Sequence, residues 1–271
     1  MKSFFLNALR SLGFAPSATQ TDDMNAGRAA LVQKNYTLAM KKFKRAARAG
    51  NAAAQIQMGH FFREGLGTKP NPNKTVYWYR LAALQRNVTA QFTLGVIYNN
   101  GEGVKQDFVD AVHWYQLAAL QGDANSQSNL GLMYEKGQGV LQDYTQALNW
   151  YRMAAVQGHI VAQFNMGLMH EKGDGVTQSF DEALKWYRLA ANQGHGEAQG
   201  NLGVMYAKGE GVTQDYKTAH MWFNIAAAAA AGCDSVATKN RDAMTQKMDA
   251  QQISEAQKMA RTWQAGRILP G

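Results

Sequence analysis

The six histidines of this chain are the residues whose chemistry would be most informative, because imidazole binds metal ions and transfers protons. His159 and His195 lie 36 residues apart. On successive packed helices they would stand about 10 Å apart, too far to share a metal ion at bonds of about 2 Å. His113 has only Asp110 as a carboxylate on its own helix, and His170 replaces a recurring tyrosine. We therefore predict no metal site and no catalytic residue.

Short glycine loops are the second feature that resembles a chemical site. The loops 101–103, 173–175 and 209–211 each enclose an acidic residue between two glycines. None has the Gly-Lys-Ser/Thr ending of a phosphate-binding loop, and Leu66 or Gln138 takes the middle place in equivalent loops. We interpret them as turns between helices.

The cysteine content limits the chemistry further. The single cysteine of the chain, Cys233, excludes an internal disulfide framework and a multi-cysteine metal site. With no nucleophile and base at a recurring spacing, we expect a protein without a cofactor and without enzymatic activity.

A block of Trp-Tyr followed by Ala-Ala returns every 36 residues and defines the organisation of the chain. It begins at Trp78, Trp114, Trp150 and Trp186 and ends as the Trp-Phe pair at 222–223. A fixed period of this length is typical of a stack of similar units, each touching only its neighbours. The elements that would position any functional residue are therefore the helices of such a unit.

The copy over residues 107–142 shows how one unit folds. Asp107 is a good N-cap for a first helix over roughly 108–121, Gly122 suits the left-handed residue that ends it, and Asp123 caps a second helix to about Lys136. The first cap recurs as Asn35, Asn71, Asp143, Ser179 and Asp215, the second as Asn51, Asn87, His159 and His195.

Two residues inside the second helix recur without an obvious local reason. Gly131 recurs as Gly59, Gly95, Gly167 and Gly203. A glycine within a helix costs about 1 kcal/mol relative to alanine, so its recurrence predicts a helix crossing too close for a Cβ atom. Gln127 recurs as Gln55, Gln91, Gln163 and Gln199. We expect this glutamine to bond a neighbouring backbone rather than a ligand.

The run from Trp186 to Val212, with Gly194-His195-Gly196-Glu197-Ala198-Gln199 and Gly209-Glu210-Gly211-Val212, resembles the Sel1-like repeat family, a subset of the tetratricopeptide-like repeats. The resemblance covers roughly residues 35–230. It implies an all-α fold, a right-handed α-solenoid of antiparallel helix pairs, and a role as adaptor or scaffold in protein assembly, often in bacteria. Some cysteine-rich members act on β-lactams. Their paired cysteines are absent here, so that activity is not carried over.

The expected domain organisation follows the 36-residue period. We expect a leader or disordered segment over 1–20, a capping helix over 21–34, a divergent repeat over 35–70, repeats over 71–106, 107–142, 143–178 and 179–214, a degenerate repeat over 215–248, and a capping helix and tail over 249–271. The leader loosely resembles an export signal, but Asn7 and Arg10 interrupt its apolar run. The compartment therefore stays open, with the cytoplasm favoured over export.

The net charge of +8 is concentrated near the N-terminus. Residues 1–50 hold nine Lys and Arg against two Asp and Glu, whereas the repeats are near neutral. The basic patch consists of Lys41, Lys42, Lys44, Arg45 and Arg48. It favours either a solvated outer face or a surface for anionic lipid or an acidic partner. Nucleic-acid binding is not expected, because the repeats carry no basic stripe.

On the first helix of each copy, the positions that vary are spaced four, three and four residues apart and therefore share one face. We call this face the variable stripe. Its members are Asn73, Tyr77, Arg80 and Leu84; Val109, His113, Gln116 and Leu120; Thr145, Asn149, Arg152 and Val156; Asp181, Lys185, Arg188 and Asn192; and Lys217, Met221, Asn224 and Ala228. The alternative is that these positions vary because nothing touches them.

We expect the variable stripe to bind a protein or an extended peptide. The predicted contact residues are Tyr77, Arg80, Leu84, His113, Gln116, Asn149, Arg152, Lys185, Arg188 and Asn192. The arginines would hold carboxylates or backbone carbonyls, and Tyr77 with Leu84 would anchor an apolar stretch. We interpret the chain as a monomeric, non-enzymatic adaptor. The alternatives are a bacterial cell-envelope or secreted factor in stress or host interaction, and a membrane-surface protein using its basic N-terminal end.

Overall fold

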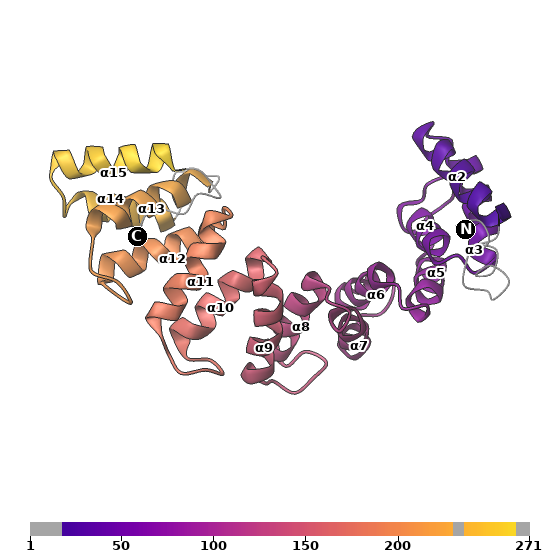
Figure 1. Ribbon diagram of the computed structural model, residues 1–271, viewed down its shortest axis with the longest axis horizontal. Helices are drawn as coiled ribbons and strands as arrows, with labels where there is room; N and C mark the ends of the chain where they lie inside the picture. Colours follow the sequence, from indigo (N-terminus) through magenta and orange to yellow (C-terminus); the bar gives the residue numbers. More distant parts are fainter. Residues whose placement is uncertain (1–17, 230–235, 264–271) are drawn as a thin grey trace, which may run out of the picture. The chain divides into compact units, whose positions relative to one another are not determined.

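The computed structural model describes residues 18–229 and 236–263, and within these ranges all regular structure is α-helical (Figure 1). The predicted all-α fold is confirmed. The described residues form two compact units, one of residues 18–126 with 138–140, the other of residues 127–137 with 141–229 and 236–263. Cys233 and nearly all of the predicted leader lie outside the described residues.

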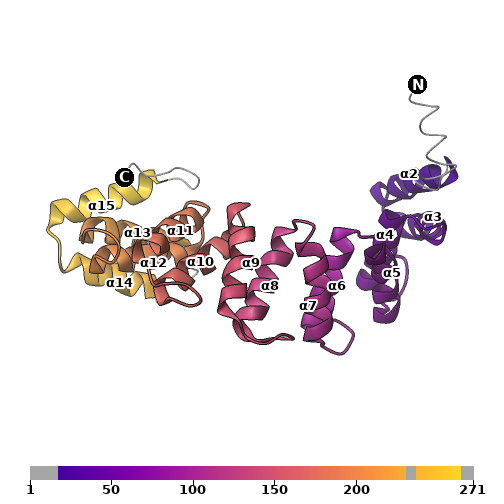
Figure 2. The ribbon, with the colours of Figure 1, turned by 60° about the horizontal axis from the view of Figure 1, so that its bottom comes forward.

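In each unit, successive helices pack against one another as hairpins, except that the final two helices of the second unit both pack on the helix before them (Figure 2). The first unit contains α2 (Ala18–Val32), α3 (Tyr36–Arg48), α4 (Ala52–Glu64), α5 (Pro72–Leu84), α6 (Val88–Asn100), α7 (Phe108–Ala119) and the start of α8 (Ala124–Lys136). The second contains most of α8, then α9 (Tyr144–Val156), α10 (Ile160–Lys172), α11 (Phe180–Asn192), α12 (Gly196–Lys208), α13 (Tyr216–Ala229), α14 (Val236–Thr245) and α15 (Ala250–Thr262).

The predicted N-caps are confirmed. Asp107 Oδ1 accepts hydrogen bonds from the backbone amides of Val109 and Asp110, both at 3.0 Å. His159 and His195 cap their helices in the same way, because each Nδ1 accepts from the amide three residues later, at 3.2 and 3.3 Å. These two imidazoles therefore have a structural role that needs no metal ion.

The recurring glycine of the second helix lies beneath an aromatic ring of the next repeat. A Cβ on Gly95 would stand 2.5 Å from the Tyr115 ring, and one on Gly167 would stand 2.5 Å from the Tyr187 ring. The same contact joins Gly59 with Tyr79, Gly131 with Tyr151, and Gly203 with Phe223. The predicted close crossing is confirmed, and the aromatic residue of each Trp-Tyr or Trp-Phe pair is what fills it.

The recurring glutamine bonds the backbone, as predicted. Gln91 Nε2 donates to the carbonyl of Ala83 at 3.0 Å, and Gln121 Nε2 donates to Gln91 Oε1 at 2.7 Å. A second glutamine, just after the first helix, thus completes the interaction with the following repeat. The same glutamine pairs are Gln85 with Gln55, Gln157 with Gln127, and Gln193 with Gln163.

Two glycine-to-alanine variants in the second unit distinguish the crowded position from an open one. Gly167→Ala places a methyl group against Tyr187, whereas a Cβ on Gly200 of α12 would have no neighbour within 4 Å. We expect Gly167→Ala to lower the free energy of unfolding by about 1–3 kcal/mol. Gly200→Ala should raise it by about 1 kcal/mol, since alanine is the better helix former. Chemical denaturation measures both, and equal effects would contradict the crossing geometry.

Candidate partner-binding surface

In the first unit, the variable stripe carries large apolar side chains in solvent. Tyr77 and Leu84 on α5 are 56% and 73% exposed; Val109 on α7 and Leu120, which directly follows α7, are 66% and 68% exposed. The Tyr77 ring stands edge-on to Trp78, with the centroids 5.1 Å apart. Burying such side chains against a partner removes apolar surface from water, which favours association. These residues are therefore suited to anchor an apolar ligand segment.

The remaining predicted residues of the first unit are polar and exposed. Arg80, His113 and Gln116 all lie at the surface. The His113 ring stands edge-on to Trp114 at 5.1 Å, as Tyr77 does to Trp78. The tryptophan thus supports the stripe residue that precedes it, which the sequence pattern alone did not indicate.

In the second unit, the variable stripe is polar, and two of its predicted cations already have partners. Arg188 Nη2 donates to the Tyr206 hydroxyl, and its guanidinium carbon lies 5.9 Å from the centre of that ring. Lys185 Nζ lies 2.6 Å from Glu182 Oε1. Arg152 and Asn149 are exposed, whereas Asn192 is half-buried. Of the three predicted arginines, Arg188 is therefore held in place by the fold, and Arg80 and Arg152 lie more freely in solvent.

His170 occupies the position that Tyr206 holds in the next repeat, and it is buried. Burial lowers the pKa of the His170 imidazole; the Glu182 carboxylate opposes this shift, and the Arg152 guanidinium reinforces it. Its Nδ1 has no hydrogen-bond partner among the described residues. The ring is therefore neutral near pH 7.

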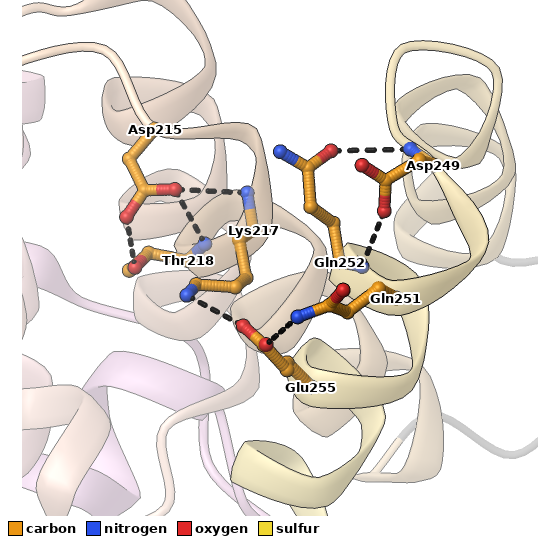
Figure 3. Close-up of polar contacts among 7 residues, drawn as sticks. All are labelled: Asp215, Lys217, Thr218, Asp249, Gln251, Gln252 and Glu255. Carbon is orange, nitrogen blue, oxygen red and sulfur yellow. Dashed lines mark hydrogen bonds and ion pairs between the residues drawn. The ribbon is translucent and has the colours of Figure 1, made fainter.

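The variable stripe of the last repeat is partly covered by the C-terminal helix, unlike the stripes of the other repeats. Met221 on α13 is fully buried, and Met259 and Trp263 at the C-terminal end pack against the same cluster. Lys217 Nζ is 2.9 Å from Glu255 Oε2, so α15 is also held to α13 by an ion pair (Figure 3). Fewer stripe residues of this repeat are therefore available to a partner than the sequence suggested.

The basic patch is partly neutralised within the fold. Arg45 Nε lies 2.5 Å from Asp23 Oδ2, and Lys42 Nζ lies 3.5 Å from Asp23 Oδ1. Asp23 comes from α2 and is buried. Two of the five basic residues thus hold α2 to α3, and Lys41, Lys44 and Arg48 are exposed, with no ion pair to another described residue.

The described part of the chain, residues 18–229 and 236–263, offers neither a metal site nor a membrane-spanning helix. In these ranges no three His, Cys, Asp or Glu side chains gather closely enough to hold a metal ion. None of the helices described there is both long and apolar enough to cross a bilayer. The exposed variable stripe is therefore the candidate surface for binding a partner.

Helix hairpins joined by glycine turns and packed in series define a tetratricopeptide-like repeat protein. The model of the Sel1 repeat matches residues 26–51, 52–87, 88–123, 124–159, 160–195 and 196–230. The chain belongs to the Sel1 repeat family. Among curated proteins, none matches this sequence.

Two solved structures are similar over most of the chain. A Sel1 repeat protein from Oxalobacter formigenes is 31% identical, with a TM-score of 0.75, over 87% of this chain and 97% of that one. A protective antigen of uropathogenic Escherichia coli strains is 36% identical, with a TM-score of 0.73, over 83% of this chain. The match covers 48% of the antigen, so this chain spans about half its length. Both support the α-solenoid fold class.

His170 gives a pH-dependent stability that can be measured. Its pKa is lowered in the folded state, so below about pH 6.5 the unfolded imidazole binds a proton that the folded one does not. The stabilisation from the neutral ring is complete above that pH and is lost as pH falls towards the folded pKa. We expect His170→Tyr, which restores the recurring residue, to reduce the fall in melting temperature between pH 7.5 and 5.5.

A matched variant separates this effect from the loss of a histidine as such. The exposed His113→Gln should leave the pH dependence of the melting temperature as it is in the parent protein. Identical pH profiles for His170→Tyr and the parent would contradict a neutral buried imidazole.

Proposed function

We propose that the protein is a non-enzymatic adaptor that binds a partner protein through the variable stripe of its first helices. Sel1 repeats generally mediate protein–protein interaction, and the family is shown by the repeat model and by similar structures. The observation that carries the proposal is the exposure of large apolar side chains on the stripe of the first unit, such as Tyr77 and Leu84.

The stripes of the two units offer different chemistry, and each suits its own kind of ligand segment. The stripe of the first unit would bind apolar side chains of the partner. Such contact would remove the exposed apolar surface of Leu84, Val109 and Leu120 from water. The stripe on α9 would take carboxylates or backbone carbonyls through Arg152, whose planar guanidinium can donate two parallel hydrogen bonds. Arg188 already donates a hydrogen bond to Tyr206, so its side chain would stay on this surface and would not extend towards the partner.

Substitutions in the stripe test the proposal. We expect Tyr77→Ser with Leu84→Ser, and separately Arg80→Glu with Arg152→Glu, to lower recovery of the native partner at least tenfold. The first pair removes apolar contact area, and the second reverses charge. Quantitative mass spectrometry after capture from native cells measures recovery, and circular dichroism verifies the fold.

Matched controls lie outside the stripe. Leu141→Ser removes an apolar side chain that is 91% exposed in a turn, and Lys136→Glu reverses an exposed charge on α8. Both should capture the partner like the parent protein. Equal recovery by the stripe variants and these controls would exclude the stripe as the binding surface.

A second candidate function is that of a bacterial envelope or secreted factor acting in stress or host interaction. The 36% identity to a protective antigen of uropathogenic Escherichia coli strains favours it. The mass of the mature N-terminus tests this candidate, since export through a signal would remove a leader within residues 1–20. An intact N-terminus in the native protein would argue against cleaved export.

A further inference from the structure

A cavity of about 500 Å³ lies between α12, α13 and α14 in the second unit. Gly200 and Val204 line it from α12, Phe223 and Ala229 from α13, and Asn240 from α14. Small-molecule sites in proteins have volumes of roughly 300–1,000 Å³. The cavity is separate from the variable stripe, so its role does not depend on the proposed adaptor function.

The cavity exists because two side chains that fill this place in an earlier repeat are missing. Gly196 and Gly200 stand 36 residues after Ile160 and Phe164. The Phe164 ring packs on Tyr187, with centroids 5.8 Å apart. A Cβ at Gly196 or Gly200 would meet nothing within 4 Å. Phe223, the equivalent of Tyr187, therefore lacks the aromatic neighbour that its register would give it.

A side-chain amide that donates a hydrogen bond in the preceding repeat is also missing beside the cavity. Gln163 Oε1 accepts from Gln193 Nε2 at 2.7 Å. One repeat later, Gln199 Oε1 has no partner among the described residues, although Gln199 is only 1% exposed. Ala229 stands in the register position of Gln193, and Ala229 lines the cavity. Gln199 itself is not among the residues that line the cavity, but a donor that enters beside Ala229 would stand in the register position of the Gln193 amide, which pairs with Gln163. Leaving a buried carbonyl unpaired is costly, so such a donor would be favoured.

We propose that this cavity binds a small, neutral aromatic molecule that carries one N–H or O–H donor. The ring lies against Phe223 in the place that Phe164 fills against Tyr187, and the donor reaches Gln199 Oε1 in place of the missing glutamine amide. Ring pairs of this kind stabilise a complex beyond the burial of apolar area alone. Glu197 at the lining disfavours an anionic ligand. Indole has the required ring and a single N–H donor.

Calorimetric titration of the full chain with indole and with 1-methylindole tests the proposal. We expect saturable one-to-one binding of indole, and weaker binding of 1-methylindole by about twofold to tenfold, which corresponds to one neutral hydrogen bond. Gly200→Phe supplies the missing ring from the protein itself and should weaken indole binding at least tenfold. Ala229→Gln supplies the missing amide and should abolish the preference for indole over 1-methylindole.

The controls keep a loss of binding separate from a loss of folding. Gly200→Phe and Ala229→Gln restore residues of the repeat and should melt no lower than the parent protein. Lys208→Phe adds the same ring at the exposed end of α12 and should bind indole like the parent. The proposal is overturned if the parent shows no saturable binding of indole, or if Gly200→Phe binds it within twofold of the parent.

Discussion

The contact on which both units depend is that of a helix glycine beneath an aromatic ring of the following repeat. At Gly95 and Gly167 even a methyl group would stand 2.5 Å from the ring. The distance between consecutive repeats is therefore set by the contact of the ring with the helix backbone at the glycine. The position of a backbone varies far less than that of a side chain. The buried glutamine pairs then fix the rotation, because Gln121 reaches Gln91 only when the helices are in register.

Because these contacts repeat, the positions between them are free of packing constraints, and the first helices can carry different side chains in each copy. This explains why Tyr77, His113, Asn149 and Lys185 occupy one register position without disturbing the fold. It also explains why the apolar stripe of the first unit costs little in folding. The helix is held by its opposite face, where Trp78, Tyr79, Ala82 and Ala83 are buried.

The sequence predicted those features that depend on local geometry or on the 36-residue period. The N-caps, the crowded glycine and the backbone bond of Gln91 each leave a recurring signature within one copy. Pairs between different elements that occur only once in the chain leave none. Arg188 with Tyr206 and Asp23 with Arg45 join residues 18 and 22 positions apart, on helices whose facing sides are known only once they are packed. The closure of the last stripe by α15 was missed for the same reason.

The cavity at α12 and α13 forms where the side chains of the repeated pattern come to an end. Tyr187 donates a hydrogen bond to Glu171 at 2.5 Å, and one repeat later both groups are gone, since Phe223 and Ala207 take their places. The Phe164 ring, the Gln193 amide and the Tyr187–Glu171 pair thus all lack an equivalent one repeat later. Gly203, in contrast, still lies against Phe223. That contact keeps α12 and α13 at their usual spacing, so the missing side chains leave a cavity where a less constrained helix pair would close.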